Sequence, residues 1–371
     1  MRRLIVCADG TWKSDDDKQP GGKPRTNVVK LRDAILPAAS DGIEQKVFYD
    51  PGVGAQGGWF KRVLGGGTGQ GLSENVRDCY GFLVDNYQPG DQLFFFGFSR
   101  GAFTVRSLAG LVRKCGILRG DDKASIPEAY EFYRKRGREY HPSSPSAVEF
   151  RKQHRSRETT IRCLGVWDTV GSLGVPTAGP IGMFTRHRYG FHDVRLSSSV
   201  ENAFHALAID ERRKPFAPAL WTVRESDVAR DAKQRIEQRW FAGVHSNVGG
   251  GYEDCGLSDL TLQWMLERAQ ECGLEFKPGV LEGLKCDCAG TLYESMTPFY
   301  RAFGPLDRKI GEPQHDSETG EPLVTFESVD DSVHERYGRG LKPPYATAGF
   351  INYWRKNPSR WPPHQPPAAN G

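Results

Sequence analysis

Residues 93–102 read LFFFGFSRGA, and this stretch decides the fold. An unbroken apolar run is typical of a strand that is buried on both faces of a parallel sheet. The run stops where Gly97 and Gly101 enclose Ser99. This pentapeptide fits G-x-S-x-G, a sharp turn between a strand and a helix that exposes a nucleophilic serine. A plain turn with a solvated serine is the alternative.

Strand-like and helix-like segments alternate on both sides of this turn. Apolar runs predict strands at 4–8, 46–50, 92–98, 160–167 and 239–245, and helical spacing predicts helices at 26–36, 72–87, 99–115, 199–209 and 258–272. Such alternation predicts a mostly parallel central sheet flanked by helices. With the serine turn at a strand end, the expected fold class is α/β, specifically the α/β-hydrolase fold.

The length of the chain and the positions of its Gly- and Pro-rich segments predict one catalytic domain over 1–357. The charged stretch 119–158 is expected to be a surface insertion, 171–195 a candidate lid, and the Pro-rich tail 358–371 disordered.

The charge composition argues against nucleic acid as a partner. Lys+Arg number 50 against 46 Asp+Glu, which gives a net charge of +4, and the basic residues are scattered rather than clustered. No stretch approaches the roughly 18–20 apolar residues of a membrane span, and the N-terminus is too short in apolar residues for a signal peptide. We therefore expect a cytoplasmic protein with reduced core cysteines, with export by a signal-less secretion system as the alternative.

A nucleophilic serine needs a base, and the base needs a carboxylate to orient it. In α/β-hydrolases the acid follows the serine in the chain and the histidine follows the acid. Asp168 comes directly after the apolar stretch LGVW, and His245 comes after WFAGV. His205 is expected to be a structural histidine within a helix, and His334 is the most serious rival base.

Three glycine-containing stretches are candidates for binding an anion. The helix that begins after Ser99 predicts the Arg100 amide as one oxyanion donor. Amides near Gly10 and Thr11 either supply the second donor or belong to a structural Asp-Gly turn. The stretch GGGTGQG at 65–71 resembles a phosphate loop, but Leu72 stands where that motif requires lysine.

A zinc site is not expected, because Cys286-x-Cys288 lacks a second ligand pair. A cofactor is not expected either, because a serine, a histidine and an aspartate can cleave an ester without one.

In the candidate lid, apolar residues are interrupted by glycines and prolines. Met183 and Phe184 are expected to contact an acyl chain there, and Arg186 a phosphate head group. A packed surface loop with solvated cations is the alternative.

With these residues identified, the sequence resembles the uncharacterised α/β-hydrolase family that includes phospholipase effectors of bacterial type VI secretion. The matching segments run in order across about residues 5–268 and include ADGTW, YDPGVG, GLSENVRDCYGFL, LFFFGFSRGAF, GVWDTVGS, HALAIDERR and WFAGVHSNVGGGY. The resemblance implies a triad of Ser99, Asp168 and His245. It also implies an acidic residue where this chain has Asn247 and asparagine where it has Lys13.

The expected function is a serine esterase that cleaves carboxylic esters, specifically lipid esters, without a cofactor. A non-catalytic binding or scaffold protein that retains the fold is the alternative. The expected partners are a lipid or other ester, with peripheral membrane contact. The resemblance adds a secretion machinery as a partner class, but the long C-terminal region of the larger effectors has no counterpart here, so secretion and membrane docking are not carried over.

Overall fold

The computed structural model describes residues 1–10, 24–52, 68–170, 196–228, 233–302, 304–316 and 319–357. Several expectations fall outside these ranges. They concern Thr11 and Lys13, the first part of the glycine-rich stretch at 65–67, the candidate lid at 171–195 with Met183, Phe184 and Arg186, and the tail at 358–371.

Seven strands form the central sheet, in the order β10-β7-β5-β4-β3-β1-β2. Their bounds are β1 (Arg3–Ala8), β2 (Gln45–Asp50), β3 (Gln92–Phe98), β4 (Cys163–Trp167), β5 (Asn202–Ala208), β7 (Arg235–Phe241) and β10 (Glu327–Val329). Each strand pairs with its neighbours in parallel. The sheet, flanked by helices, confirms the predicted fold class.

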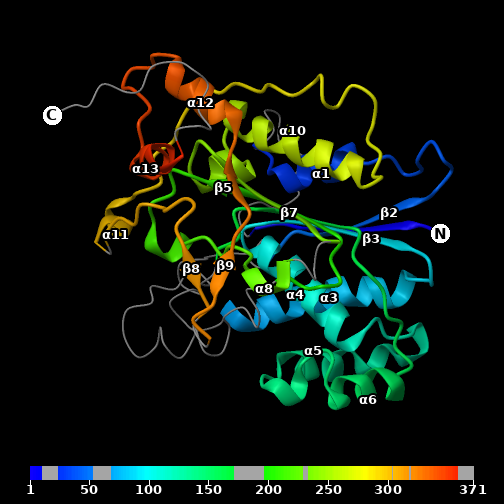
Figure 1. Cartoon of the computed structure of the whole chain (residues 1–371). Coiled ribbons are helices and arrows are strands. Elements are labelled where there is room, and N and C mark those ends of the chain that lie inside the picture. Colours follow the sequence, from blue (N-terminus) through cyan, green and yellow to red (C-terminus); the bar gives the residue numbers. More distant parts are fainter. Residues whose placement is uncertain are drawn as a thin grey trace.

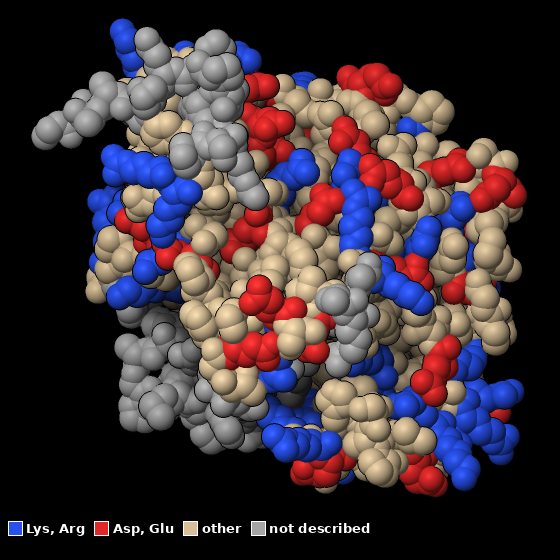
Figure 2. Space-filling model, in the orientation of Figure 1, with Lys and Arg blue, Asp and Glu red and all other residues tan. Residues whose placement is uncertain are grey.

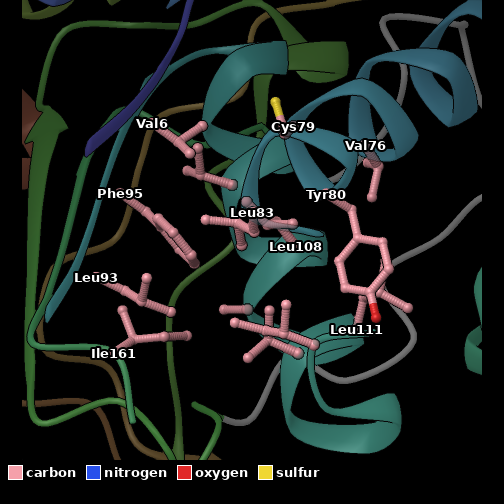
Figure 3. Close-up of a cluster of buried hydrophobic side chains, with 14 of the residues drawn as sticks. Val6, Val76, Cys79, Tyr80, Leu83, Leu93, Phe95, Leu108, Leu111 and Ile161 are labelled. Atoms are coloured by element: carbon pink, nitrogen blue, oxygen red, sulfur yellow. The ribbon is translucent and has the colours of Figure 1, made fainter. Parts of the chain in front are cut away.

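Helices cover both faces of this sheet (Figure 1). Helices α3 (Thr68–Asn86) and α4 (Arg100–Cys115) lie on one face, and α1 (Asn27–Ala34) and α10 (Gly256–Glu271) lie on the other. Strand β1 shows the alternation directly, because Leu4 and Val6 belong to the first apolar cluster and Ile5 and Cys7 to the second. Figure 3 shows the first cluster, where Val6 and Phe95 face Leu83 and Leu108.

The helix-start signals in the sequence are met at α1. The Thr26 side chain accepts a hydrogen bond from the Val29 amide, as an N-cap residue does. Helix α10 begins at Gly256, two residues before the predicted cap Ser258. Boundaries of this kind are the least certain part of a sequence-based assignment.

Two predicted elements were wrong. Residues 202–208 form strand β5 and not a helix, because both faces of this strand are buried and its side chains therefore show no alternation between apolar and polar. The strand predicted over 239–245 ends at Phe241, and His245 opens the short helix α9 (His245–Gly249).

The charged stretch 119–158 folds into helical segments that lie outside α3 and α4 (Figure 1). The segments are η1 (Gly120–Ser125), α5 (Ile126–Arg134), η2 (Arg138–Tyr140) and α6 (Pro145–Gln153). Ile126, Ala129 and Tyr133 of α5 join the apolar cluster of α3 and α4. The insertion is therefore anchored by a small apolar face beneath a charged exterior.

The chain that follows α10 wraps one edge of the sheet. Helices α12 (Asp331–Gly338) and α13 (Ala348–Lys356) cover Trp240 of β7, and Phe350 packs at the centre of that cluster. A small antiparallel sheet joins β6 (Val223–Arg224), β9 (Pro322–Val324) and β8 (Gln314–His315). The remaining short segments are η3 (Lys214–Phe216), α8 (Glu225–Val228) and α11 (Pro298–Arg301). In the ranges described, no helix combines the length and apolarity needed to cross a bilayer.

Candidate active site

Strand register brings the candidate residues to one edge of the sheet. Phe98 of β3 is paired with Trp167 of the adjacent strand β4, so Ser99 and Asp168 leave the sheet side by side. Strand order also reverses beside β3, since β2 lies on one side of β1 and β3 on the other. The carboxyl ends of strands at such a reversal are where open α/β sheets bind ligands.

The three side chains meet at hydrogen-bond distance. His245 Nε2 lies 2.8 Å from Ser99 Oγ, and His245 Nδ1 lies 2.6 Å from Asp168 Oδ2. The imidazole is 5% exposed and the aspartate is fully buried. The rings of Phe98 and Phe216 flank the imidazole, with centroids 4.7 and 5.0 Å away. The histidine is thus held between its two polar partners by aromatic packing.

The two glycines around Ser99 are required by close backbone packing. A Cβ at Gly97 would lie 2.5 Å from the Gly101 carbonyl oxygen, and a Cβ at Gly101 would lie 2.0 Å from the Ala8 carbonyl oxygen. Ser99 itself has φ 57° and ψ −115°, outside the regions that L-residues ordinarily occupy. This strained turn presents the hydroxyl at the sheet edge, as the G-x-S-x-G pattern predicts.

Arg308 holds the buried aspartate from behind. Its Nη1 lies 2.5 Å from Asp168 Oδ1 and its Nη2 lies 3.0 Å from Asp168 Oδ2, in a bidentate pair. The same guanidinium donates to the carbonyl oxygens of Ala208 and Phe216. Burial would raise the pKa of Asp168, but the charge of Arg308 and then the hydrogen bond with His245 outweigh it and hold that pKa well below its usual range.

A second buried carboxylate supports the start of α9. Glu211 Oε2 lies 3.3 Å from the His245 amide nitrogen, and Ser295 Oγ donates to Oε1. Burial opposes ionisation of Glu211, but the Arg213 guanidinium, which pairs with it at 2.7 Å, more than compensates and lowers its pKa. Glu211 thereby fixes the backbone that carries the imidazole.

The amides of the predicted oxyanion donors Arg100 and Gly10 have different surroundings. Arg100 is the first residue of α4, so its amide lies at the positive end of the helix beside Ser99. Gly10 also lies against the serine, but its amide donates to its neighbour Asp9 Oδ1 at 2.7 Å. The role of Gly10 as the second oxyanion donor stays a prediction, which requires its N–H to leave Asp9, and Thr11 lies outside the described residues. Asp9 is buried, and that burial raises its pKa to about 6.

His205, His334 and Asn247 have packing or hydrogen-bond partners outside the group formed by Ser99, His245 and Asp168. His205 Nε2 accepts from the Thr169 amide, and its Nδ1 lies 3.1 Å from Gln238 Oε1. Burial lowers the pKa of His205 to about 3. His334 lies on α12 and packs against Phe350, away from the serine turn. Asn247 Oδ1 accepts from the amides of Val244 and Tyr293, and its Nδ2 donates to the Thr291 carbonyl.

Sequence reasoning missed Arg308, Glu211 and Phe216. A buried aspartate requires a partner, but the chain holds 50 Lys and Arg, and no periodic pattern around position 308 singles out one of them. Glu211 carried a signal, since it lies in the quoted segment HALAIDERR just beyond β5, at the same sheet edge as His245.

All eight cysteines are free thiols, and six of them are buried. Cys286 is exposed, and its Sγ lies 3.1 Å from Gln263 Oε1. Within the part of the chain that the structure describes, no three His, Cys, Asp or Glu side chains are grouped as a metal site.

Comparison with known proteins gives one family. The sequence profile described as T6SS, phospholipase effector Tle1-like, catalytic domain matches residues 2–268. The uncharacterized protein YEL023C of Saccharomyces cerevisiae is 24% identical in an alignment 415 positions long, which covers 76% of this chain and 58% of that protein. The chain thus spans little more than half the length of this relative.

Two solved structures are similar to this chain. An uncharacterized protein from Pseudomonas aeruginosa gives a TM-score of 0.47 at 16% identity, covering 82% of this chain and 48% of that one. The Tle1 effector bound to the VgrG spike from the type 6 secretion system gives a TM-score of 0.43 at 14% identity, covering 89% of this chain and 92% of that one.

Proposed function

The chain belongs to the family of Tle1-like phospholipase effector catalytic domains of type VI secretion, and from this membership we propose that it is a serine esterase acting on lipid esters. The observation that carries the proposal is the hydrogen-bonded series from Ser99 Oγ through His245 to Asp168. The family supports lipid as the substrate class, and a secretion machinery is the partner class that its description suggests.

In the proposed reaction, Ser99 Oγ attacks the ester carbonyl carbon while its proton passes to His245 Nε2. Asp168 accepts from Nδ1 and stabilises the imidazolium that forms. The tetrahedral intermediate collapses, and the alcohol leaves with the proton from Nε2. Water then attacks the acyl-enzyme with His245 again as base, which releases the carboxylic acid and regenerates the serine. No cofactor takes part.

The surroundings of the three residues fit this chemistry. The Arg100 amide, at the N-terminus of α4, would donate to the developing oxyanion. Arg308 keeps Asp168 ionised, so that the aspartate remains an acceptor for Nδ1 of the imidazole. Phe98 and Phe216 restrict rotation of the ring, which favours the productive orientation.

The decisive experiment compares the protein with its Ser99→Ala variant on phosphatidylethanolamine and phosphatidylglycerol vesicles. Fatty-acid release should fall by a factor on the order of 10⁴–10⁶ without loss of the fold. The matched control is Ser107→Ala, a buried serine on the same helix, which should keep full activity if it folds. A fluorophosphonate probe should label the parent protein at Ser99 and leave Ser99→Ala unlabelled.

A binding or scaffold protein with the same fold is the second candidate. It predicts no labelling by the probe and no hydrolysis of p-nitrophenyl esters of any acyl length. Activity that survives Ser99→Ala would contradict the proposed nucleophile outright.

A further inference from the structure

A cavity lies beside α4, and Ser99 is not among the described residues that line it. It has a volume of about 250 Å³ and lies between α4, α5 and the 135–142 connection on one side, and β4, residues 196–200 and Trp221 on the other. This volume is near the lower end of the range for small-molecule sites, about 300–1,000 Å³.

The cavity is separate from the candidate active site. Lys114 in its lining follows Arg100 by fourteen residues, which at 1.5 Å per residue places it about 21 Å along α4 from the serine end. Leu164 in its floor precedes Asp168 by four residues, about 13 Å back along β4. Along α4, the charged lining residue nearest to the serine end is Arg106, six residues or about 9 Å from Arg100. The cavity therefore extends from the middle of α4 toward the amino-terminal edge of the sheet, and its described lining does not include Ser99, Asp168 or His245.

Positive charge dominates the lining. Its charged members are Arg106, Arg113, Lys114, Lys135 and Arg136, with His141 beside them, and the described lining includes no Asp or Glu. Figure 2 shows Lys and Arg side chains gathered on the lower part of this face, where α5 and α6 lie.

Two of these cations, Arg106 and Lys114, are buried. Lys114 Nζ donates to the carbonyl oxygens of Tyr133 and Lys135, and it shares the rings of Phe132 and Tyr140 with Lys135 Nζ at 5.2–5.7 Å. Burial, and then the nearby charge of Lys135, lowers the pKa of Lys114 to about 8. Burial likewise lowers the pKa of Arg106 to about 9. Charges held in this way attract an anion strongly.

The inner wall of the cavity is apolar. Leu164, Leu196, Val200 and Trp221 line it, and each is at most 8% exposed. Arg106 stacks over the Trp221 ring at 4.9 Å, so a cation lies at the boundary between the charged and apolar parts. Lys135 and Arg136 are exposed at the rim, where a ligand would enter.

From this juxtaposition we propose that the cavity is a second binding site for an anionic amphiphile, with its oxyanion held by the Arg and Lys side chains and the start of its apolar chain against Leu164, Leu196 and Trp221. A phosphate monoester with an alkyl chain and a fatty carboxylate share this chemistry. The inference goes beyond the proposed hydrolysis and does not depend on Ser99 being a nucleophile.

The test is isothermal titration of the full chain carrying Ser99→Ala, which prevents turnover of any ester. The probes are octyl phosphate, octanoate, inorganic phosphate and neutral octyl glucoside, each below its micelle concentration. Octyl phosphate and octanoate should bind saturably, and the tighter of the two identifies the anion source. Inorganic phosphate and octyl glucoside should bind at least about tenfold more weakly, since each lacks one half of the recognition.

The variant Lys135→Gln/Arg136→Gln removes the two rim cations at exposed positions where folding should be unaffected. It should weaken the binding of octyl phosphate at least about tenfold, because the two cations where the ligand enters no longer attract its phosphate group. The matched control is Arg119→Gln/Lys152→Gln, which removes two exposed cations outside the cavity lining. The proposal would be contradicted if both double variants lost the same affinity for octyl phosphate. It would also be contradicted if the parent chain bound octyl phosphate no more tightly than inorganic phosphate or octyl glucoside.

Discussion

At the scale of single residues, Arg308 decides whether a buried aspartate can be an anion. Asp168 is fully buried, and an unpaired carboxylate in such a place would become protonated. A protonated Asp168 would serve the imidazole poorly, because the acceptor for Nδ1 would lose its charge. The bidentate guanidinium supplies the positive charge, and its further bonds to Ala208 and Phe216 fix it in place.

Substitution of Arg308 by methionine should therefore cost stability and activity together. Breaking a buried ion pair from one side costs about 3–5 kcal/mol at neutral pH. Urea unfolding of Arg308→Met at pH 7 should show a loss of this size, and Arg308→Lys should recover only part of it, since lysine cannot form the bidentate pair. An unchanged urea midpoint in Arg308→Met would contradict the role assigned to this pair.

The same pair predicts a pH dependence. The pKa of Asp168 is lowered in the folded state, so its contribution is present above the unfolded value of about 4 and is lost as pH falls below it. The stability gap between the parent protein and Arg308→Met should thus be largest at neutral pH and should narrow as the pH falls to 4 and below, because the unpaired Asp168 of the variant takes up a proton. Urea midpoints measured across this window check the sign, and a gap that widens in acid would show that another group is responsible.

Asn247 allows a second test at the scale of single residues, since the family resemblance implies an acidic residue at this position. Its oxygen accepts from two amides, but its Nδ2 faces the Thr291 carbonyl oxygen at 2.9 Å. Asn247→Asp keeps the acceptors and replaces the donor by a carboxylate oxygen. We expect a loss of about 1–3 kcal/mol at pH 8 that shrinks in acid, where a protonated aspartic acid can donate again. Circular dichroism melting at pH 5 and 8 measures it, and equal stability of the two proteins at pH 8 would contradict it.

At the scale of elements, the strand-turn-helix unit of β3 and α4 was readable from the sequence because three independent signals agree there. The apolar run, the glycine spacing and the helical period each point to the same boundary. The helix predicted over 199–209 was wrong for lack of such agreement, since β5 is buried on both faces and has no flanking glycine turn. Arg308 could not be placed, because it lies outside the strands and 140 residues from Asp168, so only the folded chain brings the two together. Glu211 could have been placed at the sheet edge from its position just beyond β5, but not its bond to the His245 amide.

The turn between β3 and α4 predicts a large cost for one added methyl group. Gly101→Ala would place a Cβ 2.0 Å from the Ala8 carbonyl oxygen, so β1 and α4 must move apart. We expect a loss of at least about 1–3 kcal/mol and reduced probe labelling of Ser99. Gly338→Ala is the control, because no atom lies within 4 Å of its added Cβ on α12, and it should be neutral or slightly stabilising. A tolerated Gly101→Ala would show that this packing is not needed.

At the scale of the whole molecule, the chain leaves the reacting edge of the sheet directly after Asp168. It forms a bridge between Val170 and Pro218, and is next described at Leu196 in the apolar cluster under α4. The intervening residues 171–195, with Met183 and Phe184, lie outside the described part, and their role as a lid over an acyl chain remains a proposal. The described residues on either side of the segment, Val170 and Leu196, are both buried, and Val170 follows Asp168 by two residues.

This proposal makes a prediction about substrate length. If the segment covers the acyl chain, each added methylene should contribute up to about 0.8 kcal/mol, or about fourfold in kcat/KM. Hydrolysis of p-nitrophenyl esters should then rise steeply with acyl length in the parent protein, and phosphatidylglycerol vesicles should be preferred over a matched short-chain ester. Deletion of 178–188 should flatten this dependence while fluorophosphonate labelling of Ser99 continues at an unchanged rate, because the hydroxyl and the imidazole remain in place. A length dependence that survives the deletion, with the short ester preferred at equal concentration, would leave a carboxylic ester hydrolase without a lipid-specific cleft.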